Sequence, residues 1–168
     1  MNKKIFFNIV IQLLNFIRYG LIALTGLIIL ALLILLIGGK PIQNSLQLTV
    51  PLSIIVIILI ISIVLVVCFI YLATILKKLI LNFQKGTIFS TENVVYTKII
   101  LGTLIVWTSI QFASAFFLSY LDLKNISDLY DFSLSDYFIN GVLIIIALLA
   151  KMILEKGLLL QAENDEII

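Results

Sequence analysis

The sequence contains no histidine, one cysteine and two prolines, and only 12% of its 168 residues are charged. Without histidine a histidine-based proton relay is excluded, and Cys68 alone cannot form a disulfide within the chain. A single thiolate also argues against a metal cluster, so we expect no cofactor and no metal site. The net charge of +2 is too small to indicate direct binding of nucleic acid.

Hydrophobic residues make up 62% of the chain, and the mean hydropathy is +1.26. About 20 apolar residues at about 1.5 Å each cross the roughly 30 Å hydrocarbon core of a bilayer. The apolar runs predict a single all-α domain, residues 1–168, which is a polytopic membrane protein: a four-transmembrane-helix bundle with short cytoplasmic helical extensions. The four spans are expected at about residues 19–38, 52–76, 99–121 and 137–154.

Residues 1–18 have an amphipathic pattern. Polar residues recur on one helical stripe among apolar ones, at Lys4, Asn8, Gln12 and Asn15. This pattern predicts a helix that lies in the membrane interface before the first span. The apolar stretch is too long for a signal peptide, and no cleavage site of the A-x-A kind follows it.

Glycine and proline mark the ends of the first two spans. Gly38-Gly39-Lys40-Pro41 predicts a break after the first span and a polar link, and Pro51 suits the start of the second helix. Beyond residue 76 the apolar stripe continues, so the second helix should extend out of the membrane until Gly86 ends it. Ser90 is then expected to cap the third helix by accepting from the amide of Asn93.

Basic residues are distributed unequally between the two sides. If all four runs cross the bilayer, nine Lys and Arg residues share one side and two, Lys40 and Lys124, lie on the other. The positive-inside rule then predicts a multi-pass protein of the cell membrane with both termini in the cytoplasm. The loop 77–98 and the tail 155–168 would be cytoplasmic, and the loop 122–136 would face outward.

The third span is the most polar one. Thr103, Trp107, Gln111 and Ser114 fall within one sector of a helix. Such a stripe in lipid is expected to face other helices, where amides and hydroxyls find partners. A cavity for a small apolar or amphipathic ligand and an ion path are the alternatives, although no ionisable side chain lies in the span.

The acidic loop and the fourth span are weaker signals. The loop 122–136 holds four aspartates and one lysine, which is typical of a solvated acidic loop; a cation site is the alternative, without calcium-loop spacing. The fourth span has only 13 uncharged residues, 138–150, so it must borrow flanking residues while Lys151 reaches the headgroups. A re-entrant helix would fit that length as well.

Two short stretches carry a resemblance. Residues 85–93 (KGTIFSTEN) and 157–165 (GLLLQAEND) resemble those of a family of small bacterial four-span membrane proteins of unknown function. Members of that family are often encoded beside a small helix-turn-helix regulator. The resemblance implies four helices with both termini in the cytoplasm, and a role in controlling a transcription factor. The chain departs from the family at Ala162, where relatives carry an acidic residue, and in its Glu166-Ile167-Ile168 ending.

The tail is acidic and the central loop is basic. An intramolecular clasp between them is one expectation, since several exposed ion pairs can fix a geometry although each contributes only about 0 to 1 kcal/mol. A disordered tail is the other. Together the two stretches form a candidate partner surface, with Lys77, Lys78, Lys85, Phe89, Glu92, Asn93, Gln161, Glu163, Asn164 and Asp165.

Three classes of function remain. The first is a membrane-anchored regulator or sensor without catalytic activity, which binds a soluble cytoplasmic partner such as a helix-turn-helix transcription factor; any DNA contact would belong to that partner. The second is an accessory or immunity protein that associates with a transporter or with a membrane-active peptide. A membrane enzyme is disfavoured, because the clustered carboxylates lie only in the outer loop and the tail. Lipids are partners in every case, and a homo-oligomer remains open.

Overall fold

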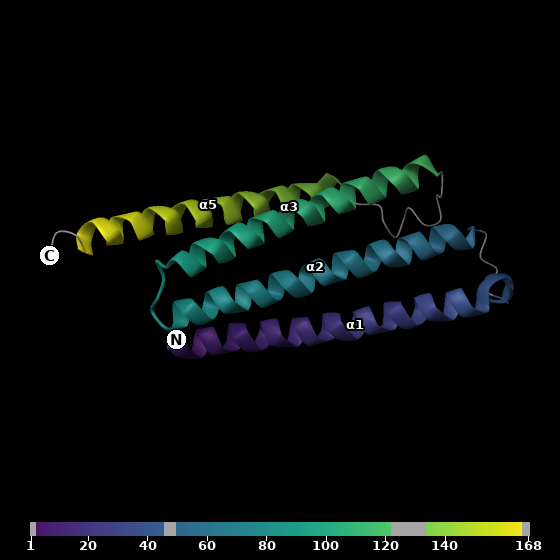
Figure 1. The fold of residues 1–168 in the computed structure, drawn as a ribbon, viewed down its shortest axis with the longest axis horizontal. Coiled ribbons are helices and arrows are strands. Elements are labelled where there is room, and N and C mark those ends of the chain that lie inside the picture. Colours follow the sequence, from purple (N-terminus) through teal and green to yellow (C-terminus); the bar gives the residue numbers. More distant parts are fainter. Residues whose placement is uncertain (1–2, 46–49, 122–133, 166–168) are drawn as a thin grey trace.

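Four long α-helices make up the described part of the chain. The computed structural model describes residues 3–45, 50–121 and 134–165, in which every regular element is helical: α1 (Lys3–Ser45), α2 (Leu52–Gln84), α3 (Thr91–Tyr120) and α5 (Leu134–Asp165) (Figure 1). Each contains a segment long and apolar enough to cross a membrane: Lys4–Gly39, Leu52–Gln84, Thr91–Tyr120 and Tyr137–Asn164. The all-α, four-span prediction is confirmed. The acidic segment 122–133 and the tail end 166–168 lie outside the described residues.

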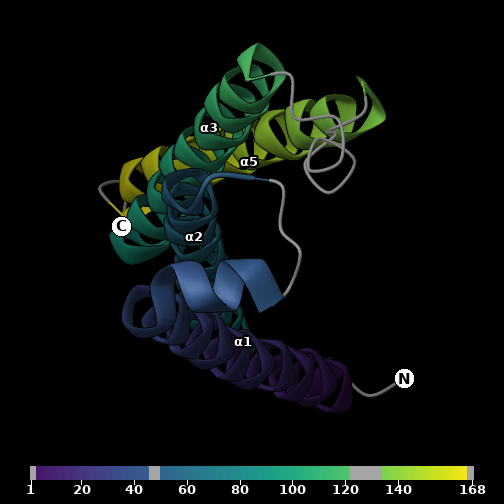
Figure 2. The ribbon, with the colours of Figure 1, turned by 90° about the vertical axis from the view of Figure 1, so that its right-hand side faces the viewer.

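The helices form an open row. α1 packs on α2, α2 on α3, and α3 on α5, whereas no contact joins α1 to α5 within the described ranges. Figure 2 shows this order, with α1 and α5 at opposite sides and α3 crossing α5. The core therefore lies among α2, α3 and α5, and it consists of Leu72, Ile75, Leu79, Val94, Ile100, Leu104, Ala147 and Leu154. Most large apolar side chains of α1 remain exposed, as suits a helix surrounded by lipid.

The first helix differs from its prediction. Residues 3–18 do not form a helix of their own, because α1 runs unbroken from Lys3 past residue 19; the interfacial position of this stretch stays a prediction. No helix-breaking pair separates the amphipathic start from the apolar span, so the hydrogen-bonded ladder continues. Near its beginning α1 runs beside the end of α2, where Gln84 Nε2 donates to Asn8 Oδ1 at 2.8 Å.

The predicted break near residue 39 is present as a kink. Gly39 has φ 45° and ψ −133°, a conformation that glycine adopts easily. Helical backbone then resumes through Pro41 to Ser45, so the polar link begins later than the sequence suggested. Residues 46–49 lie outside the described ranges.

The fourth span is a full helix. α5 is a single helix of 32 residues, which at 1.5 Å per residue is about 48 Å long. Its candidate span of 28 residues exceeds the uncharged run because the helix continues through Lys151 and Glu155. An unbroken helix of this length favours a full span over the re-entrant alternative.

Three features share one end of the row. The start of α1, the turn between α2 and α3 and the end of α5 lie together (Figure 1). This end carries most of the basic residues of the chain, and we call it the basic end. Because all four helices exceed the roughly 20 residues needed to span a bilayer, the helices can project beyond the membrane here.

Candidate functional site

The two stretches singled out in the sequence meet at the basic end. Phe89 follows α2 in the turn, and its ring lies directly on Gly157 of α5. A methyl group at position 157 would overlap that ring, so only glycine permits this approach. The contact joins the turn to the helix that carries the tail.

The turn that presents Phe89 is built by the end of α2. Gly86 has φ 85°, its amide donates to Phe83 O at 3.1 Å, and the amide of Thr87 donates to Asn82 O at 3.1 Å. These two bonds define a Schellman motif, which satisfies the last carbonyls of the helix. The predicted end at Gly86 is confirmed. So is the predicted cap of α3, because Ser90 Oγ accepts from the amide of Asn93 at 3.3 Å.

Asn93 holds the turn from inside. Its side chain is fully buried, accepts from Asn82 Nδ2 at 2.9 Å, and donates to the carbonyls of Thr87 at 2.7 Å and Ile88 at 2.8 Å. An amide can do this because it both accepts and donates. The prediction that Asn93 belongs to a partner surface is wrong in this structure, because none of its side chain is accessible.

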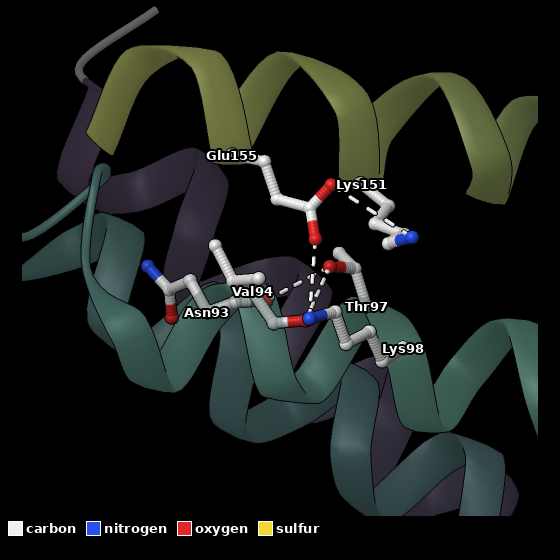
Figure 3. A network of polar contacts seen from close by, with 6 residues as sticks. All are labelled: Asn93, Val94, Thr97, Lys98, Lys151 and Glu155. Atoms are coloured by element: carbon white, nitrogen blue, oxygen red, sulfur yellow. Dashed lines mark hydrogen bonds and ion pairs between the residues drawn. The ribbon is translucent and has the colours of Figure 1, made fainter. Parts of the chain in front are cut away.

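An ion pair joins α3 to α5 one to two turns farther along. Lys98 Nζ lies 3.1 Å from Glu155 Oε1, and Lys151 Nζ lies 3.7 Å from Glu155 Oε2 (Figure 3). Beside it the hydroxyl of Thr97 donates to the carbonyls of Asn93 and Val94. All three charged side chains remain partly exposed, so the pair contributes about 0 to 1 kcal/mol.

The predicted clasp between the acidic tail end and the central loop stays a prediction, because the side chain of Asp165 and residue 166 lie outside the described part. Within the described residues Glu163 forms no ion pair with Lys77, Lys78 or Lys85, while Lys98 of the loop pairs with Glu155 at the start of the tail. The turn and the tail helix also meet through the aromatic contact of Phe89 with Gly157.

Two grooves flank the contact between α3 and α5. One, about 550 Å³, is lined by Phe89, Gly157, Leu160, Gln161, Glu163 and Asn164, and we call it the Phe89 groove. The other, about 460 Å³, is lined by Thr91, Val94, Val95, Lys98, Glu155, Leu158 and Leu159. Their apolar walls are exposed: Leu159 and Leu160 are 63% and 65% accessible.

The remaining partner-surface residues are accessible to different degrees. Lys78 lies over the ring of Tyr96 at 5.9 Å, and Lys77 is half-buried. Glu92 accepts from Asn82 Nδ2 at 3.2 Å while it remains exposed. Lys85, Gln161, Glu163 and Asn164 are exposed, and none of them has such a contact within the described ranges. The side chain of Asp165 lies outside the described part.

The polar stripe of α3 is divided between two neighbours. Asn140 Nδ2 of α5 donates to Gln111 Oε1 at 2.6 Å, and both residues are buried. Trp107 packs edge-on against Phe69 of α2, with ring centroids 4.4 Å apart, and its buried indole N–H finds no hydrogen-bond partner among the described residues. The stripe thus lies between helices, as expected.

The hydroxyls of the stripe do not join helices. Thr103 donates to Ile99 O at 2.8 Å and Ser114 donates to Ile110 O at 2.6 Å, each within α3. Among the described contacts of the four stripe residues, only the side-chain amide of Gln111 forms a hydrogen bond to another helix. Thr103 lines a groove of about 390 Å³ between α2 and α3, but Trp107, Gln111 and Ser114 do not.

Sequence reasoning missed three residues of this architecture. Asn140 donates a hydrogen bond to Gln111, and Asn82 donates one to Asn93. Gly157 is the residue on which the ring of Phe89 lies. Asn140 could have been noticed as the one amide in the run 138–150. No group of three or more His, Cys, Asp and Glu that could hold a metal ion is found in the part of the chain that the structure describes.

A protein-family model described as "Protein of unknown function (DUF2975)" matches residues 47–168. The matched region contains α2, α3 and α5, hence the turn, both grooves and the polar stripe, and leaves α1 outside. No curated protein and no solved structure matches the chain.

Proposed function

The chain belongs to the DUF2975 family of proteins of unknown function, and we propose that it is a membrane-anchored regulator whose basic end binds a soluble cytoplasmic protein, such as a helix-turn-helix transcription factor. In this proposal both termini are cytoplasmic and the chain catalyses no reaction. The DNA contact belongs to the partner.

One observation carries the proposal. Leu159 and Leu160 are 63% and 65% exposed although they lie past Lys151 and Glu155, on the part of α5 that leaves the membrane if these charges mark its boundary. Val95 and Phe89 add exposed apolar surface beside them. Apolar patches with a polar rim on a water-facing surface are typical of protein interaction sites.

The fold also offers a route for a signal. α3 carries Gln111 in the buried contact with α5, and the same two helices form the walls of the second groove, which Val95, Lys98 and Leu159 line at the basic end. A ligand or stress that changed the packing of α3 against α5 in the membrane would therefore change the shape of the docking surface. Such coupling requires two discrete packings of the same helices.

The test is crosslinking in the native membrane followed by purification of the full chain and identification of its partners. We expect the wild type to recover a soluble protein, and a variant with Leu159→Ser and Leu160→Ser to lose it. The matched control is Tyr120→Ser, which changes a side chain that is 82% exposed at the opposite end; it should retain the partner. Partner recovery that survives the double substitution would contradict the proposal.

The same experiment separates the alternative role as an accessory or immunity protein. The open row leaves the outer faces of α1 and α5 without a helical neighbour among the described elements, so a second membrane protein could pack there. Crosslinks from these faces to a transporter subunit or to a membrane-active peptide, with no soluble partner, would favour that role.

A further inference from the structure

We infer that the Phe89 groove is the site that receives the soluble partner, and that the segment it receives is a basic amphipathic helix. This inference rests on the proposed function and adds the place and chemistry of the contact. Four observations carry it: the position, size, apolar wall and charge of the groove.

The position favours a soluble occupant. The second groove lies nearer the membrane, since Lys98 and Glu155 of the ion pair line it and it ends at Leu159. The Phe89 groove extends instead to Asn164, nine residues beyond Glu155, which is about 13 Å along the helix axis. Lipid chains do not reach that far into water, so we expect a soluble protein to occupy the Phe89 groove.

The size and wall favour large apolar side chains. A volume of about 550 Å³ lies within the range of about 300 to 1,000 Å³ that is usual for ligand pockets. Leu160 and Phe89 face it from α5 and from the turn, and the ring of Phe89 occupies the space that a side chain at Gly157 would need. A partner helix presents anchors for such a groove at positions i, i+3 or i+4 and i+7.

The charge favours basic residues beside those anchors. Glu163 is the one charged residue that lines the groove, and it has no ion pair among the residues whose placement is described. It lies in the last turn of α5, where unpaired carbonyls give the helix end about half a negative charge. Lysine or arginine on the partner would be attracted by Glu163 and by the negative end of the helix.

The backbone of the turn beside the Phe89 groove is fixed. Asn93 bonds to Asn82, Thr87 and Ile88, so the backbone that carries Phe89 is held beside α5. Preformed walls reduce the entropy lost on binding. The turn and α5 therefore form the groove before a partner binds.

The experiment uses the full chain in discs of phosphatidylcholine and two fluorescent peptides of about 18 residues, long enough for several helical turns. Both peptides have leucine on one helical face; one has lysine and the other glutamate on the opposite face. Empty discs measure adsorption to lipid. We expect the lysine peptide to bind the chain about tenfold more tightly than the glutamate peptide.

Variants locate the site. Leu160→Ala should weaken binding of the lysine peptide several-fold, whereas Leu159→Ala, which removes an equally exposed neighbour on the other flank of α5, should not. Glu163→Lys should reverse the preference between the peptides. Equal effects of the two leucine variants, or an unchanged preference in Glu163→Lys, would overturn the assignment of the groove.

The two proposals fail separately. If the peptides bind no better to the chain than to empty discs while crosslinking still recovers a soluble protein, the groove inference is wrong and the proposed function stands. If the peptide preferences hold but crosslinking recovers no soluble protein, the regulatory function is wrong although the groove binds basic helices.

Discussion

The ring of Phe89 lies on the backbone of Gly157, and this contact is where the α2–α3 turn meets the tail helix. Neither residue is charged, although charge complementarity is what the sequence of these two segments suggests. The glycine creates the space and the aromatic ring fills it, so a small change at either position should alter the groove without unfolding the protein.

We expect Gly157→Ala to displace the ring of Phe89. Alanine gains up to about 1 kcal/mol of helix stability over glycine, but its methyl group would overlap the ring, which is 41% exposed and can move into water. A trifluoromethyl phenylalanine at position 89 should show a changed ¹⁹F shift. Gly141→Ala is the matched control, since nothing lies within 4 Å of the added methyl group; an identical shift in both variants would argue against the contact.

Asn93→Asp should destabilise the turn. A carboxylate cannot donate to the carbonyls of Thr87 and Ile88, and leaving buried polar groups unsatisfied costs about 1 to 3 kcal/mol. Denaturant unfolding followed by the fluorescence of Trp107, the single tryptophan, measures the loss. Asn164→Asp, at an exposed position of α5, serves as the control and should unfold like the wild type.

The buried pair Gln111 and Asn140 should be energetically coupled. Hydrogen bonds between helices in membranes contribute about 0.6 kcal/mol on average and up to about 1.7 kcal/mol, and this one is short, at 2.6 Å. A double-mutant cycle with Gln111→Leu and Asn140→Leu should give a coupling energy in that range. Ser109→Ala with Asn140→Leu should show no coupling, because Ser109 is exposed and bonds within its own helix. Additive effects in the first cycle would exclude an energetic role for the pair.

Labelling of single cysteines tests the orientation. In a Cys68→Ala background, cysteine at Lys85 or Lys156 should react with a membrane-impermeant maleimide only from the cytoplasmic side, and cysteine at Lys40 only from the outside. The physical reason is the retention of basic loops in the cytoplasm during insertion. Reaction at positions 85 and 156 from opposite sides would divide the basic end and remove the basis of the regulatory proposal.

Several elements could be predicted from local signals. Gly86 ends α2 and Ser90 caps α3 as expected, because both depend on residues close in the chain. The fourth span was ambiguous because Lys151 and Glu155 interrupt its apolar run; α5 nevertheless continues through them to Asp165, with Glu155 paired to Lys98 on the neighbouring helix. The predicted boundary after residue 18 is absent from α1. An amphipathic pattern does not indicate whether a helix continues into the next span.

The sequence by itself determined the class of protein, the number of spans and the gathering of basic residues at one end, because hydrophobicity and charge act on each segment independently of its neighbours. Tertiary structure alone decided that the helices form an open row, that Asn93 is buried and that Gly157 receives Phe89. These depend on which helix faces meet, and in lipid many apolar faces are equally suitable for contact. The choice is made by shape and by a few amides, such as Gln111 with Asn140, whose partners lie far away in the chain.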